Sequence, residues 1–104
     1  MDFNEYQRKT REFAIYNSPI YPCLGLSEET GELIGKIAKA VRDGVTDPEA
    51  YVESVKKEAG DVLWMLARLL DDRNIALDDV AAMNIEKLQD RKNRNVIGGS
   101  GDNR

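Results

Sequence analysis

Apolar residues recur every three or four positions through most of the chain, which is the spacing of amphipathic helices. No stretch alternates with the period of a β-strand. The pattern predicts four helices, over residues 2–16, 27–44, 47–72 and 78–95. Their expected N-cap residues are Asp2, Ser27, Asp47 and Asp78. Asp47 followed by Pro48 is the clearest start signal, since proline suits the first helical position.

These elements predict an all-α fold, a bundle of four to five helices in one domain over residues 1–97. Residues 98–104 form a glycine-rich C-terminal tail, a composition typical of mobile termini. A chain of 104 residues buries a thin core, so oligomerisation would help to stabilise the domain.

The composition excludes several classes of function and of metal site. The net charge is −4, which disfavours binding of a nucleic-acid polymer. No apolar run approaches the roughly 20 residues of a membrane span, so no membrane association is expected. The chain has no histidine, which excludes histidine catalysis and histidine-containing zinc sites, and its single cysteine, Cys23, fits a reducing, cytoplasmic compartment.

Acidic residues interrupt the apolar pattern on two of the predicted helices. Glu58 and Asp61 border the apolar stripe of the third helix, and Glu29 and Glu32 border that of the second. If the two helices pack by their stripes, these four carboxylates face one another, an arrangement that needs a counter-cation at pH 7. A shell of carboxylates and water suits Mg²⁺ or Mn²⁺ better than zinc.

A simpler interpretation exists for part of this pattern. Glu28 and Glu29 follow the expected cap Ser27, and acids in the first turn of a helix interact favourably with its dipole. The dipole does not account for Glu58 and Asp61, which lie in the middle of a helix.

The fourth helix carries a polar set of a different kind. Asn84 lies in the middle of its apolar stripe, and Lys87 and Arg91 continue the same side. One amide and two cations at helical spacing suit phosphate oxygens and a sugar hydroxyl. The competing explanation is that basic residues in a last turn complement the helix C-terminus.

Taken together, Glu28-Glu29-x-x-Glu32, Glu58-x-x-Asp61 and Asn84-x-x-Lys87-x-x-x-Arg91 resemble the motifs of the MazG-like nucleoside triphosphate pyrophosphohydrolases, of the single-domain type. The resemblance implies an all-α, dimeric or tetrameric, Mg²⁺-dependent enzyme that converts (d)NTP to (d)NMP and pyrophosphate. It implies that Glu29, Glu32, Glu58 and Asp61 bind the metal, and that Asn84, Lys87 and Arg91 bind the nucleoside triphosphate. Glu28 or Glu32 is the candidate base that activates water.

Three further questions stay open at this point. The main alternative to an enzyme is a non-enzymatic acidic helical module for dimerisation or partner binding, in which Glu58 would pair with a basic residue. Lys36 and Lys39 follow the acidic motif and either assist phosphates or form a solvated face. Trp64 lies opposite the apolar stripe, where a partner subunit or a nucleobase would cover it, and Tyr21 is a second candidate for base stacking.

Overall fold

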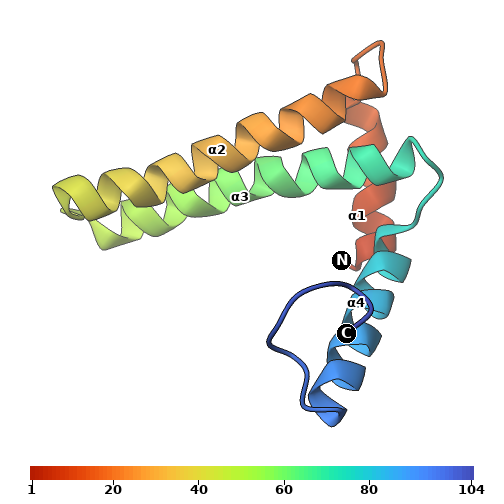
Figure 1. The fold of residues 1–104 in the computed structure, drawn as a ribbon. Coiled ribbons are helices and arrows are strands. Elements are labelled where there is room, and N and C mark those ends of the chain that lie inside the picture. Colours follow the sequence, from red (N-terminus) through yellow and green to blue (C-terminus); the bar gives the residue numbers. More distant parts are fainter.

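Two long antiparallel helices form the main body of the protein. The computed structural model describes all 104 residues and contains four α-helices and no strand, which confirms the all-α class. Helix α2 (Ile20–Asp43) and helix α3 (Pro48–Asp71) are joined by a short turn and pack along their length (Figure 1). As predicted, the side chain of Asp47 caps α3 by accepting the backbone N–H of Ala50 at 3.1 Å, and Pro48 is the first helical residue.

The remaining helices lie at the end of this hairpin. Helix α1 (Phe3–Thr10) continues into a 3₁₀ turn, η1 (Arg11–Phe13), and crosses α3. Helix α4 (Leu77–Asn93) packs its first turns against α1 and α3 and then projects away from the hairpin (Figure 1). No helix is both long enough and apolar enough to cross a membrane.

The start of α2 differs from the prediction. Ser27 is not an N-cap, because the helix begins seven residues earlier, at Ile20. Proline is usually a signal of a loop, but Pro22 occupies the first turn of α2, where a backbone N–H has no acceptor in the helix and proline costs little. Gly25 is helical and buried against Met65, whose side chain would clash with any Cβ at this position.

Two other helix ends also differ. The first helix was expected to reach residue 16, but regular helix stops at Thr10, since the chain tightens into η1 and Arg11 turns to pair with Asp71. Asp2 caps it as predicted. Asp78 does not cap α4; it lies in the first turn. The first N–H of α4, that of Leu77, is instead accepted by the side chain of Gln7.

Gln7 is the buried polar link between the helices at this end. Its Oε1 accepts from Leu77 N at 2.9 Å, and its Nε2 donates to the carbonyl oxygen of Ile75, also at 2.9 Å. Unpaired buried groups cost about 1–3 kcal/mol each, so this side chain fixes where α4 leaves the hairpin. Nothing in the apolar pattern singled it out.

A buried arginine ties the end of α3 to the segment before α2. The Arg68 guanidinium pairs with Asp71 and Asp72, both at 2.8 Å, and also donates to the hydroxyl of Tyr16. Arg11 reaches Asp71 from η1 at 2.9 Å. Hydrogen bonds from Arg11 above all, then from Arg68, keep the pKa of Asp71 below its usual value despite its partial burial.

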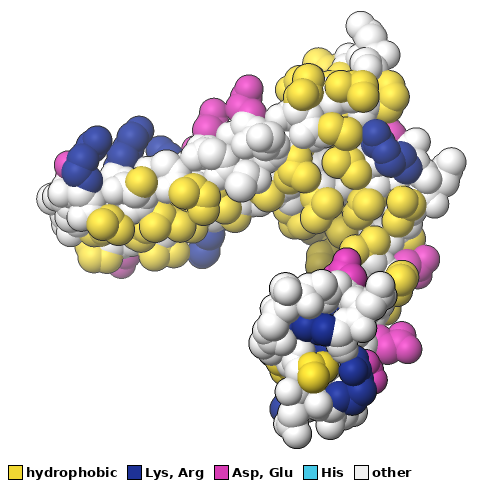
Figure 2. All heavy atoms as spheres, in the orientation of Figure 1, with side chains coloured by type: hydrophobic (Ala, Val, Ile, Leu, Met, Phe, Trp, Pro, Cys, Tyr) yellow, Lys and Arg dark blue, Asp and Glu magenta, His cyan; other side chains and the backbone are white.

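A single subunit has an open shape. Its accessible surface is 7623 Å², whereas a compact protein of this mass exposes about 5,900 Å². Its radius of gyration is 16.7 Å, against about 13 Å for a compact chain of similar length. Few apolar side chains are buried, namely those of Pro22, Met65, Ala67 and Leu77, and hydrophobic side chains cover much of the visible surface (Figure 2).

The C-terminal tail is folded rather than extended. After α4 the chain turns back along the helix, and its end lies beside it (Figure 1). Asp102 contacts Lys87 and Arg91, while the Arg104 guanidinium bonds to backbone carbonyls of the tail itself.

Candidate metal centre

Three glutamates from two helices converge at the middle of the hairpin. Glu29 and Glu32 lie one turn apart on α2, and Glu58 lies on α3. One carboxylate oxygen from each lies within 4.8 Å of the others. Antiparallel packing of α2 on α3 therefore brings together residues that are twenty-six positions or more apart in the sequence.

These glutamates have no neutralising partner within the chain. No lysine or arginine lies within 4 Å of their carboxylates. One oxygen each of Glu29 and Glu58 is buried without any hydrogen-bond partner. Buried, unpaired carboxylate oxygens are costly, so the donor set fits a hard divalent cation such as Mg²⁺ or Mn²⁺, which prefers oxygen ligands.

The electrostatics of Glu29 reflect the crowding. Its pKa is raised above the usual glutamate value, first because the carboxyl is desolvated and then because of the negative charges of Glu32, Asp61 and Glu28. Both causes disfavour the ionised form, and a bound cation would oppose both.

Asp61 and Glu28 surround the three glutamates. Asp61 is exposed on α3 and lies near enough for its charge to raise the pKa of Glu29 and, after the effect of burial, of Tyr6. It is not one of the three residues whose oxygens converge. Glu28 lines the same groove as Glu32 and Glu58.

That groove is open and entirely polar. It has a volume of about 530 Å³. On its α2 side Gly31 and Gly35 leave space between the charged side chains, since no atom lies within 4 Å of the position that a Cβ would take at either glycine. Its lining residues are Glu28, Gly31, Glu32, Gly35, Lys36, Lys39 and Glu58. The two glycines, one turn apart between acidic and basic residues, were a signal that the sequence analysis did not use.

The position at which α2 begins bears on whether the helix dipole explains Glu28 and Glu29. Since the helix begins at Ile20, Glu28 and Glu29 lie in its third turn rather than its first. The helix dipole acts on charges within the terminal turn. It does not account for these two acids.

The polar set of α4 is not brought to the cluster within one subunit. Asn84 and Lys87 are exposed on the part of α4 that projects from the hairpin, and Arg91 is buried under the tail. None of the three lines the groove. The predicted inward stripe of this helix is also largely exposed, with Val80 and Leu88 accessible.

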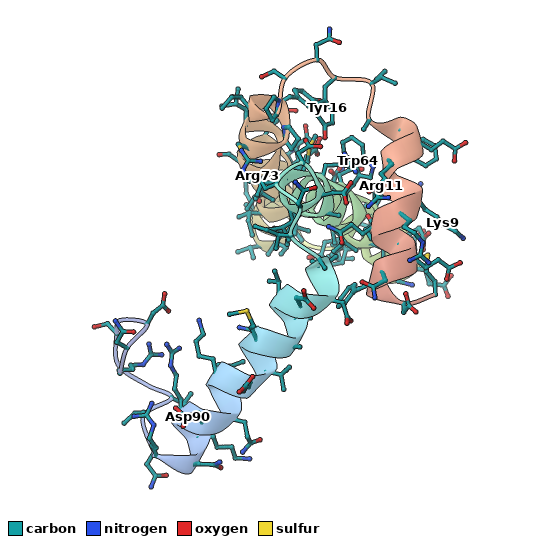
Figure 3. All side chains as sticks on the ribbon, turned by 90° about the vertical axis from the view of Figure 1, so that its right-hand side faces the viewer. Lys9, Arg11, Tyr16, Trp64, Arg73 and Asp90 are labelled. Atoms are coloured by element: carbon teal, nitrogen blue, oxygen red, sulfur yellow. The ribbon has the colours of Figure 1, made fainter.

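Trp64 is covered in part by its own chain. Its ring meets that of Tyr16 edge-on, with the ring centroids 6.3 Å apart (Figure 3). The ring of Tyr16 in turn lies 5.5 Å from that of Tyr21. The sequence had suggested that a partner subunit or a nucleobase covers Trp64. In the structure, residues of the same chain cover part of its ring. The indole N–H is buried without an acceptor.

A family model describes most of this architecture. The model for the MazG nucleotide pyrophosphohydrolase domain matches residues 20–96, which include the whole hairpin and α4. The chain belongs to the MazG family. It is also 43% identical over 86 residues to the Gene 37 protein of Mycobacterium phage L5, covering 81% of this chain and 75% of that protein. No solved structure matches it.

Family and geometry agree on the general chemistry. MazG domains are nucleotide pyrophosphohydrolases that generally depend on divalent metal ions, and this MazG domain carries a carboxylate cluster able to hold one. The matched region ends at residue 96, so the tail that folds over Arg91 lies outside it.

Divalent ions should stabilise this MazG domain. At a free Mg²⁺ or Mn²⁺ concentration ten times the Kd, binding adds about 1.4 kcal/mol to the free energy of unfolding, which raises the Tm by roughly 5–10 °C. Thermal melting monitored by circular dichroism measures the shift. Glu58→Gln should abolish most of it, whereas Glu86→Gln, an exposed change on α4, should keep it. An unchanged Tm with millimolar ion would contradict the metal centre.

Proposed function

We propose that the protein is a Mg²⁺-dependent pyrophosphohydrolase that converts a nucleoside triphosphate, (d)NTP, to (d)NMP and pyrophosphate. The observation that carries the proposal is the surroundings of Glu58, whose carboxylate meets two other glutamates and has no lysine or arginine within ion-pairing distance. Membership of the MazG family supports the reaction class.

The residues divide into an ion-holding group and a water-orienting group. Glu29, Glu32 and Glu58 would hold Mg²⁺, or Mn²⁺ in its place, with Asp61 nearby to complete the site. A bound divalent ion would neutralise phosphate charge and lower the pKa of a water molecule. Glu28, on the groove wall, or the exposed carboxylate of Glu32 would accept the proton of the attacking water.

Lys36 and Lys39 gain a role from their position. Both line the groove that contains Glu28, Glu32 and Glu58, one and two turns further along α2. Acidic side chains gather at the middle of the hairpin in Figure 2, with basic ones nearer its tip. The two ammonium groups are suited to hold the charged pyrophosphate leaving group, which makes them part of the proposed site rather than a solvated face.

The proposed enzyme is a homodimer or homotetramer. The open subunit leaves apolar residues of α2 and α4 exposed, among them Ile34 (55%), Val41 (83%) and Met83 (70%). Large exposed apolar surface of this kind is typical of an interface. Association would also let one subunit present the exposed side chains of Asn84 and Lys87 to the groove of another, which the fold of a single chain does not do; Arg91 is buried under the tail.

The non-enzymatic module is the weaker alternative. In such a module the acids would pair with lysines or arginines of the same surface, and ion pairs of that kind do form elsewhere in the chain, as between Arg94 and Asp90. The three converging glutamates form none, and two of their oxygens are buried without partners. In a non-enzymatic binding surface, carboxylate oxygens buried without partners would destabilise the protein with no compensating interaction.

Glu58→Gln should remove most of the activity with little change in fold. We expect kcat for a nucleoside triphosphate to fall at least about 100-fold, a barrier increase of about 2.7 kcal/mol. Chromatography of the nucleotide products, with separate assays for pyrophosphate and orthophosphate, measures this. The wild-type protein should release pyrophosphate and the monophosphate, and Glu86→Gln should match it. Orthophosphate as the sole inorganic product would refute the bond assigned to cleavage.

A charge on the exposed face of α2 should weaken association. Val41→Lys places an ammonium group in the expected interface, where burial costs several kcal/mol, so we expect a shift from oligomer to monomer. Sedimentation velocity over a range of protein concentrations detects it. Ile15→Lys, a similar change at an exposed apolar residue outside the helices, serves as the control. A wild-type protein that is monomeric at every concentration would overturn the proposed assembly.

A further inference from the structure

A second cavity adjoins the polar groove at the tip of the hairpin. It lies between the end of α2, the turn 44–47 and the start of α3, and it has a volume of about 340 Å³. We call it the hairpin-tip cavity, and its lining includes Lys36, Lys39, Asp43, Thr46, Asp47 and Tyr51. Lys36 and Lys39 also line the groove of the metal centre. The two spaces are therefore neighbours, with both lysines at their junction.

The acids of the hairpin-tip cavity already have partners. Asp43 accepts two hydrogen bonds from the Arg42 guanidinium, at 2.8 and 2.7 Å, and these above all hold its pKa below the usual aspartate value. Asp47 is the N-cap of α3 and accepts the backbone N–H of Ala50 at 3.1 Å. The two lysines, in contrast, form no ion pair in the chain. The unpaired charges of the cavity are thus both positive, which favours an anion there.

The two lysines lie at increasing distances from the glutamates. Because an α-helix rises about 1.5 Å per residue, Lys36 lies about 6 Å and Lys39 about 10 Å beyond Glu32 along α2. Two phosphoryl groups joined by one oxygen extend over roughly one helical turn, about 5 Å. The pyrophosphate part of a triphosphate held at the glutamates therefore reaches the lysines and leaves the hairpin-tip cavity beyond them free.

We propose that the hairpin-tip cavity is a subsite for a fourth phosphoryl group, so that the protein takes nucleoside 5′-tetraphosphates in preference to triphosphates. The ammonium group of Lys39 contacts the terminal phosphoryl group as a point charge. The proposal rests on the proposed function and keeps the bond that is cleaved there. Water attacks the α-phosphorus and gives its proton to Glu28 or Glu32. The oxygen that bridges to the β-phosphorus leaves with the bonding electron pair, and the products are the nucleoside monophosphate and inorganic triphosphate.

Binding of the two inorganic leaving groups tests the subsite without any hydrolysis of nucleotide. Isothermal titration calorimetry in excess Mg²⁺ should show inorganic triphosphate binding about three- to fivefold more tightly than pyrophosphate, the gain expected from one more exposed ion pair. Lys39→Ala should bring this ratio close to one. Lys56→Ala, the same change at an exposed lysine of α3 that lines neither space, should keep it.

A second variant acts on the subsite without removing a lysine. Arg42→Gln takes away the partner of Asp43, whose carboxylate then competes for Lys39, so the ratio of the two affinities should also fall toward one. Equal affinities of the wild type for the two ligands would overturn the subsite, as would an unchanged ratio in Lys39→Ala.

Hydrolysis assays test the substrate preference itself. The kcat/KM for a nucleoside tetraphosphate should exceed that for the triphosphate of the same nucleoside about threefold or more, with inorganic triphosphate released, and Lys39→Ala should reduce this preference. Cleavage of triphosphates with no preference for the longer chain overturns this inference alone. A protein that shows the calorimetric ratio and cleaves neither nucleotide overturns the proposed function instead.

Discussion

Repulsion between like charges on α2 and α3 is the constraint on which the functional part of the structure depends. Glu29, Glu32 and Glu58 bring oxygens within 4.8 Å of one another, and two of these residues hold a buried oxygen with no partner. Such an arrangement weakens a folded protein unless a cation offsets it. The packing of α2 on α3 fixes the positions of all three residues and so maintains the repulsion between their carboxylates. In the proposed function, a bound cation would offset this repulsion.

The rest of the fold holds α2 and α3 in the register that brings the three glutamates together. Gly25 lets Met65 pack closely against α2, one turn before Glu29. At the same end, Arg68 links α3 through Tyr16 to the segment that leads into α2, while Gln7 directs α4 away from the groove. The acids are thereby left on an open face, and the basic residues of α4 do not line the groove within one subunit.

Sequence periodicity predicted the element types well because the apolar spacing of each helix is strong. Asp47-Pro48 located the start of α3 to the residue, since both the cap and the proline have a local physical cause. The start of α2 was missed because Pro22 and Gly25 are signals of loops unless the tertiary partner, Met65, is known. The convergence of Glu29, Glu32 and Glu58 followed from helical faces, although Asp61, the fourth acid predicted there, is not among the converging residues. The corner built by Gln7 and Arg68 depends on contacts across the fold that spacing does not encode.

The claim that these three glutamates share one cation is tested most directly by a crystal structure of the protein soaked with Mn²⁺, using anomalous diffraction at the manganese edge. The account predicts a single strong peak per hairpin, or a close pair of peaks, within coordination distance of oxygens from Glu29, Glu32 and Glu58. Peaks confined to other acidic residues, or a lysine or arginine seated among the three carboxylates, would contradict it.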